Sequence, residues 1–198
     1  MESTNYRGIT LLNITFKVFS SILYTRLLPH VESKLGHYQA GFRPGKSKIN
    51  QIFGLRQILE KIKECRISIH LLFIVFKSAF DSTDREQMYV AMNELSMPQK
   101  LIRLVKMLMS NMQNQIIIQS KLSAPFILHK VVQQGDALAC LLFNITLEYA
   151  IRKSGIQTMG TILYKSVQIM AYAADISYHW QVCTINESYL KRQVKKWD

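Results

Sequence analysis

The sequence predicts an α+β fold, in which helices pack against small antiparallel sheets. Apolar residues make up 48% of the chain and charged residues 19%, a composition typical of a globular protein with its own core. Long segments repeat apolar residues at helical spacing, and shorter apolar runs have the composition of strands. These segments do not alternate regularly along the chain, which argues against a parallel α/β sheet.

The first half of the chain is expected to hold two helices and one strand. Apolar residues recur at helical spacing over 10–28 and 49–62, and the first helix should end near Pro29, since proline disrupts a helix interior. The run 69–76 is almost entirely apolar and contains β-branched and aromatic residues. Such a run predicts a buried strand at the centre of a sheet.

Two helices and a hairpin-like pair of strands are expected next. Asp84 is followed three residues later by Gln87, a pattern that resembles a capping box and predicts a helix start. Pro98 predicts a second helix start, since proline is favoured in the first helical turn. The segments 116–119 and 126–132 are typical of strands.

The last part of the chain predicts a helix, two strands and a final helix. An apolar helix is expected over 138–152, followed by strands at 167–172 and 176–182 that are separated by residues 173–175. Residues 183–198 are rich in lysine and arginine and predict a basic C-terminal helix.

The chain is strongly basic. It has 25 Lys and Arg residues against 13 Asp and Glu, a formal net charge of +12. The basic residues number 13 in positions 1–99 and 12 in positions 100–198, so the charge belongs to the folded body rather than to a tail. A polyanion such as nucleic acid is the simplest partner. The alternative is a generally basic, solvated surface.

Several classes of protein are not favoured. Cys65, Cys140 and Cys183 show no CxxC spacing, so neither a disulfide framework nor a zinc site is expected. The N-terminus lacks the pattern of a secretory signal, and the apolar run 71–76 is too short to cross a bilayer. We expect an intracellular protein, cytoplasmic or nuclear, without membrane association. A phosphate-binding GxxxxGK[ST] loop is missing, and no pattern predicts the oligomeric state.

Five segments carry a resemblance to a known family. They are NYRGITLLN at 5–13, YQAGFRPG at 38–45, LFIVFKSAFDS at 72–82, QGD at 134–136 and AYAAD at 171–175. In order and spacing they resemble the reverse transcriptase domain of non-long-terminal-repeat retrotransposons, over about 5–182. The resemblance implies a single domain over 1–198, with the interleaved fingers and palm of a right-hand polymerase. No thumb is expected, because only sixteen residues follow Val182.

The family's chemistry depends on carboxylates held by an antiparallel palm sheet. Two Mg²⁺ (or Mn²⁺) ions, about 3.5–4 Å apart, stabilise the attacking and leaving oxygens, and such hard ions take oxygen ligands. The resemblance places Val75 and Ala174 where the family has aspartates and leaves Asp175 as the remaining catalytic, metal-binding carboxylate. We therefore expect weakened metal binding and impaired or absent polymerase activity. Asp81 is a conceivable substitute ligand, although a capping or surface role is the simpler interpretation.

The resemblance also implies nucleotide-binding residues. Phe80 stands where the family has an aromatic beneath the nucleotide sugar, although a core phenylalanine is the alternative. Gln134 and Gly135 match a glutamine and glycine that approach the nucleotide, and Gly135 suits a close backbone approach.

Basic residues of the loop after Gly41 are candidates for contact with phosphates. The resemblance implies that Arg43 binds the nucleotide and that Lys46 and Lys48 bind nucleic acid, and arginine and lysine suit such contacts. The alternative is a solvated loop.

The partners implied are an RNA template, a DNA primer and deoxynucleoside triphosphates. Two alternatives to an impaired polymerase stay open: a non-catalytic nucleic-acid-binding remnant of a retrotransposon polymerase, and a remnant without activity.

Overall fold

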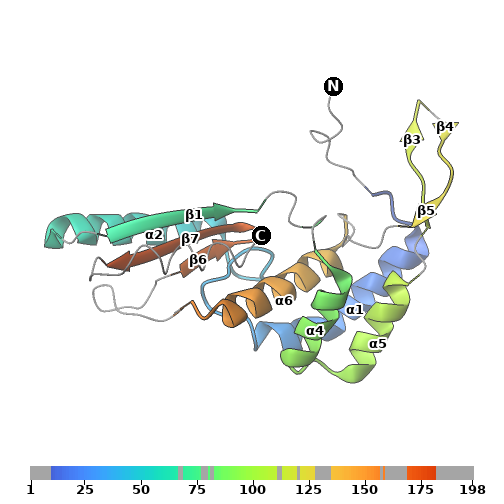
Figure 1. The fold of residues 1–198 in the computed structure, drawn as a ribbon, viewed down its shortest axis with the longest axis horizontal. Coiled ribbons are helices and arrows are strands. Elements are labelled where there is room, and N and C mark those ends of the chain that lie inside the picture. Colours follow the sequence, from blue (N-terminus) through green and yellow to red (C-terminus); the bar gives the residue numbers. More distant parts are fainter. Residues whose placement is uncertain are drawn as a thin grey trace. The chain divides into compact units, whose positions relative to one another are not determined.

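The computed structural model describes residues 10–66, 69–76, 80, 83–110, 113–119, 121–127, 135–156, 158 and 169–181 (Figure 1). These residues form helices and small antiparallel sheets, so the prediction of an α+β fold is confirmed. The expected C-terminal helix over 183–198 lies outside them.

The chain divides into two compact units, and each unit combines two stretches of sequence. The first unit contains Met1–Lys34 and Ser78–Tyr149, and the second contains Leu35–Lys77 and Ala150–Asp198.

The first unit is built on helices: α1 (Ile14–Glu32), α4 (Arg85–Glu94), α5 (Gln99–Met109) and the first part of α6 (Ala137–Ser154). Helix α5 packs against both α1 and α4. The residues that form the centre of this core are less than 2% exposed: Leu23, Leu27, Met88, Met92, Leu138, Leu141, Leu142 and Ile145.

Side-chain caps explain where two of these helices begin. The Asp84 carboxylate accepts a hydrogen bond from the Glu86 amide at 2.8 Å, so the predicted start of α4 is confirmed. Asn13 caps α1 in the same way. The predicted end of the first helix near Pro29 was wrong, because α1 continues to Glu32. Val31, only 1% exposed, anchors this last turn in the core, and its burial offsets the missing proline hydrogen bond.

A narrow β-arm extends from the helices of the first unit (Figure 1). Strand β2 (Gln113–Asn114) pairs with β5 (Phe126–Ile127), and β3 (Ile117–Ile118) pairs with β4 (Lys121–Leu122). The segments 116–119 and 126–132 were expected to pair with each other, and this was wrong, because β3 pairs with β4 while β5 pairs with β2. The Ser123 hydroxyl accepts a hydrogen bond from the Ile116 amide, and this side-chain contact separates the two short ladders. Residues 128–132 of the predicted strand lie outside the described ranges.

The second unit contains a three-stranded antiparallel sheet in the order β1-β7-β6. Its strands are β1 (Ile69–Val75), β6 (Ile169–Tyr172) and β7 (Asp175–Gln181). The predicted central, buried position of the first strand was wrong. In the described sheet β1 is an edge strand, and its side chains alternate between faces, so Phe73 is 61% exposed. An apolar run alone does not determine which strand lies in the middle.

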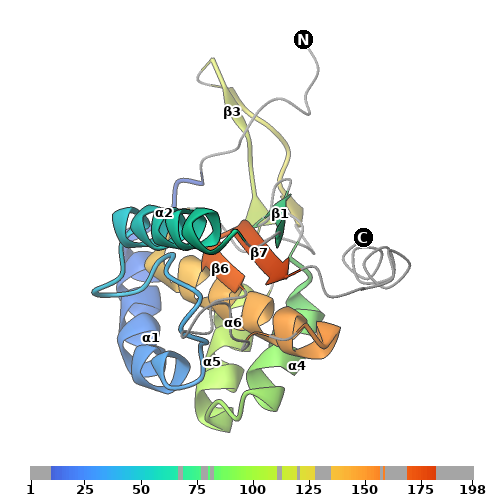
Figure 2. The same ribbon diagram turned by 90° about the vertical axis from the view of Figure 1, so that its left-hand side faces the viewer.

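Helix α2 (Lys48–Cys65) lies beside β6 (Figure 2). Gly54 allows this approach, since a Cβ atom built on it would lie 3.3 Å from the Met170 methyl group. The Ser47 hydroxyl caps the helix by accepting a hydrogen bond from the Asn50 amide at 3.2 Å.

Candidate active site

The sheet of the second unit brings together Val75, Ala174 and Asp175, the three positions at which the resemblance places the family's aspartates. Val75 at the end of β1 is paired with Asp175 at the start of β7. Ala174 lies in the tight turn between β6 and β7, and its carbonyl accepts a hydrogen bond from the Phe76 amide at 3.4 Å. Directly opposed residues of antiparallel strands have Cβ atoms about 4.5–5.5 Å apart on the same face. Side chains at 75 and 175 are therefore neighbours.

This site is open to solvent, and at the three positions Asp175 supplies the one carboxylate. Val75 is 73% exposed, and Asp175 is also exposed. Valine and alanine have no lone pairs for a cation, whereas Mg²⁺ needs several oxygen ligands. Within the described ranges, no group of three or more His, Cys, Asp and Glu residues could hold a metal ion. The residues present at the turn do not fit a pair of Mg²⁺ ions.

The turn between β6 and β7 has an unusual backbone conformation. Ala173 has a φ of 55°, in the left-handed region, which costs an L-residue about 1–2 kcal/mol. The side-chain amide of Gln39 contacts this residue on both sides of its Cα atom. Its Oε1 accepts a hydrogen bond from the Ala173 amide at 3.0 Å, and its Nε2 donates to the Ala173 carbonyl at 3.3 Å. These bonds join the side chain of Gln39 to the backbone of the turn.

A strap, defined here as residues 38–41, brings Gln39 to the turn. The Ala40 amide donates to the Ala171 carbonyl at 2.8 Å, and the Ala171 amide donates to the Tyr38 carbonyl at 2.9 Å, so the strap forms a parallel bridge with β6. Gly41 lies against the turn, because a Cβ atom built on it would be 2.1 Å from the Ala173 nitrogen. Sequence reasoning recognised this segment as a motif but missed the role of Gln39.

Arg43 braces the strap. Its Nη1 donates hydrogen bonds to the carbonyls of Gly36 at 2.8 Å and Gln39 at 3.0 Å, and the side chain is half-buried. The structure thus gives Arg43 a role in the loop, and its contact with a nucleotide stays a prediction. Lys46 and Lys48 are exposed on either side of the α2 cap, and their contact with nucleic acid also stays a prediction.

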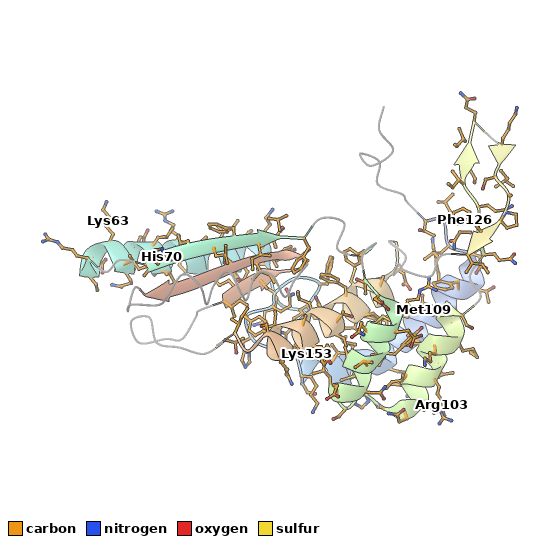
Figure 3. The ribbon with its side chains drawn as sticks, viewed as in Figure 1. Lys63, His70, Arg103, Met109, Phe126 and Lys153 are labelled. Atoms are coloured by element: carbon orange, nitrogen blue, oxygen red, sulfur yellow. The ribbon has the colours of Figure 1, made fainter. Side chains whose placement is uncertain are left out.

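Helix α2 carries further exposed charges. Arg56 pairs with Glu60 at 2.9 Å, and Lys61 pairs with Glu64 at 2.6 Å. The hydrogen bond to Glu64, together with its charge, raises the pKa of Lys61. Figure 3 labels Lys63 on this helix, an exposed side chain near its C-terminal end. Exposed pairs of this kind contribute little stability, and each pair is neutral, so neither adds to the basic charge of the helix.

Two residues expected to contact the nucleotide, Phe80 and Gly135, pack against other residues of the first unit. The Phe80 ring packs against Phe143 of α6, with centroids 4.9 Å apart. Gly135 has a φ of 128°, and a Cβ atom built on it would lie 3.3 Å from the Thr10 carbonyl oxygen, so this position favours glycine. Contact of these residues with a nucleotide stays a prediction. Gln134 and Asp81 lie outside the described residues.

None of the helices in the described part of the chain is both long and apolar enough to span a membrane.

Comparisons with known proteins agree with the resemblance found in the sequence. The chain is 22% identical over 175 residues to the transposon TX1 uncharacterized 149 kDa protein of Xenopus laevis, a match that covers 87% of this chain and 13% of that protein. Its fold is similar to that of apo telomerase from Candida tropicalis truncated from its C-terminal domain. That match has a TM-score of 0.54 and 13% sequence identity, and it covers 92% of this chain and 36% of the telomerase chain.

The family model for reverse transcriptase (RNA-dependent DNA polymerase) matches residues 2–192. This match takes in the strap, the paired positions 75 and 175, and both stretches of each unit. The chain belongs to the reverse transcriptase family.

Proposed function

We propose that this chain is a reverse transcriptase domain, with fingers and palm interleaved over 1–198, that has lost most or all of its nucleotidyl transfer activity. The observation that supports the proposal is the pairing of Val75 with Asp175 across β1 and β7. The backbone brings two positions together as a carboxylate site requires, and one of them carries a valine.

The expected defect is electrostatic. Two divalent cations would stabilise the attacking and leaving oxygens, an effect of several kcal/mol. With Val75 and Ala174 at two of the three positions, the cation-binding site lacks two formal negative charges. Asp175 alone supplies too few oxygen ligands, so we expect weak affinity for Mg²⁺ and for Mn²⁺.

Binding of an RNA template and a DNA primer does not require those carboxylates. The net charge of +12 favours attraction to phosphates, and Lys46 and Lys48 are exposed at the start of α2. The second candidate function is therefore a non-catalytic module that binds nucleic acid through the same basic residues.

Primer extension on an RNA template tests the catalytic part. The chain is compared with a Val75→Asp/Ala174→Asp variant, in Mg²⁺ and then in Mn²⁺ with deoxynucleoside triphosphates. A Val75→Asn/Ala174→Asn variant is the matched control, because it has nearly the same shape without the charges. We expect extension by the aspartate variant alone.

The other outcomes are informative. Extension by the unaltered chain would show that other ligands replace the two aspartates. Extension by the asparagine variant would show that charge is not the missing property. No extension by any variant would mean that the loss of carboxylates is not the sole defect.

A binding titration separates the second candidate from an inert remnant. Fluorescence anisotropy with a labelled RNA–DNA duplex should show affinity that falls steeply as salt rises, because bound counterions are released. If the chain does not bind the duplex at low salt, the nucleic-acid-binding module is excluded and the remnant without activity is the alternative left.

A further inference from the structure

We infer that Gln39 is a positioning residue that fixes the β6–β7 turn and thereby the place of the Asp175 carboxylate opposite position 75. The inference rests on the proposed function only where a metal-binding readout is used. The restraint on the turn can be tested without it.

The side-chain amide of Gln39 acts as an additional peptide group in the parallel bridge between the strap and β6. Backbone hydrogen bonds join Tyr38 and Ala40 to Ala171, and the side-chain amide of Gln39 continues this pattern to Ala173. Its Oε1 also accepts a hydrogen bond from the Gly41 amide at 2.8 Å. One amide therefore satisfies three backbone groups, two of them on a single turn residue.

Burial makes these contacts effective. Gln39 is 2% exposed, so water does not compete freely for its amide. A buried backbone group that loses its partner is strongly disfavoured. The bonds oppose the tendency of Ala173 to leave its left-handed conformation, because a rotated peptide would lose both contacts.

Gly41 provides an independent indication that the approach of the strap to the turn is close. Any larger residue would place its Cβ atom 2.1 Å from the Ala173 nitrogen and 2.7 Å from its Cα atom. Arg43 holds the strap from the other side, through the Gln39 carbonyl. The strap is thus fixed to the turn on one side and to its own loop on the other.

The turn controls Asp175 because it leads directly into it. Asp175 is paired with Tyr172 across the turn and with Val75 across the sheet. A change in the Ala173 peptide would alter the direction in which β7 begins. Small displacements matter at such a site, since a shift of about 1 Å can reduce a rate about 100-fold.

Amide exchange measured by NMR on the full chain tests the restraint. Gln39→Met keeps the length of the side chain but removes all three bonds. We expect the Ala173 amide to exchange about tenfold faster or more relative to the Ile176 amide, as the loss of one buried hydrogen bond predicts.

Ser154→Ala is the matched control within the same unit. Ser154 is buried, donates a hydrogen bond to the Ile151 carbonyl at 2.7 Å and accepts one from the Ile156 amide at 3.3 Å. Its loss should leave the ratio of Ala173 to Ile176 exchange unchanged. Equal ratios in Gln39→Met and the unaltered chain would overturn the inference.

If Gln39→Met does not fold, Gln39→Glu tests whether Gln39 restrains the turn. In its protonated form the glutamate retains acceptors for the Ala173 and Gly41 amides and carries no charge, so this variant is measured at acidic pH. We expect the Ala173 amide to stay protected to within about threefold, a difference smaller than that of one hydrogen bond. Unprotected Ala173 in a folded Gln39→Glu chain would contradict the role of Oε1.

Mn²⁺ binding, measured by electron paramagnetic resonance, tests the consequence for the site. In the Val75→Asp/Ala174→Asp background, Gln39→Met should weaken Mn²⁺ binding about tenfold, whereas Ser154→Ala should not change it. If the background variant itself fails to bind Mn²⁺, the electrostatic explanation given under the proposed function fails, and the exchange ratio still decides the role of Gln39. Unchanged Mn²⁺ affinity in Gln39→Met would refute the link between the turn and the carboxylates.

Discussion

The aromatic rings of Phe80 and Phe143 lie with their centroids 4.9 Å apart and their planes tilted by 34°. Phe143 is only 6% exposed and belongs to α6, so a buried helix supports the Phe80 ring from one side. Core packing and contact with a nucleotide sugar are therefore compatible roles for Phe80. The two interpretations left open by the sequence do not exclude each other.

The ring contact should appear as an energetic coupling. Replacement of Phe80 and Phe143 by leucine, singly and together, should give a coupling free energy of about 0.5–1.5 kcal/mol, as found for aromatic pairs. Urea denaturation of the four chains measures it. Additive effects of the two substitutions would show that the rings make no specific interaction.

Removal of the Asp84 cap should destabilise the chain. Asp84→Ala leaves the amides of Glu86 and Gln87 at the start of α4 without their acceptor, at a cost of about 1 kcal/mol. The control is Asp84→Asn, which keeps a capping oxygen and should cost less. The prediction fails if the two variants have the same free energy of unfolding.

Two glycines of one loop should respond differently to alanine. Gly45 has a φ of 70° and open space around it, so Gly45→Ala should cost only the strain of the left-handed conformation, about 1–2 kcal/mol. Gly41→Ala places a methyl group against the Ala173 backbone and should cost more, about 3 kcal/mol. Thermal or urea unfolding gives the order, and a larger effect at Gly45 would contradict the close contact of strap and turn.

The thiols of Cys140 and Cys65 should react at different rates. Burial, and to a lesser degree the charge of Asp136, raises the pKa of Cys140, whereas Cys65 is exposed. Only the thiolate reacts, so a raised pKa lowers the reactive fraction at pH 8. In a Cys183→Ser background, iodoacetamide should modify Cys65 first, and the Cys140 rate should keep rising at higher pH. Equal rates at pH 8 would disprove this prediction.

Substitution of Lys46 and Lys48 should weaken binding to nucleic acid. Each lysine that contacts a phosphate contributes about −0.7 to −0.9 to the slope of log affinity against log salt. Lys46→Gln/Lys48→Gln should therefore flatten the slope by about 1.4–1.8. Lys100→Gln/Lys106→Gln, on exposed positions of α5, is the comparison, and an equal change in both pairs would argue for a diffuse basic surface.

Local signals in the sequence predicted much of the fold. Asp84 determined the start of α4 because an N-cap depends on neighbouring residues. The resemblance implied that positions 75 and 175 belong to one site, but their pairing across β1 and β7 comes from the structure. The role of Gln39 was missed because its partner Ala173 is 134 residues away, and no local pattern reports such a contact. The edge position of β1 likewise depends on the pairing of distant strands.

The bonds from Gln39 to the turn reach only peptide atoms of Ala173, so they do not depend on which side chains the turn carries. Selection on the shape of the turn and selection on its carboxylates can therefore act separately over evolutionary time. Where the codons for Val75 and Ala174 end in a pyrimidine, one base change in each restores aspartate. A lineage that lost the chemistry can regain both charges by two point mutations, one at the end of β1 and one in a turn that a residue elsewhere in the gene contacts.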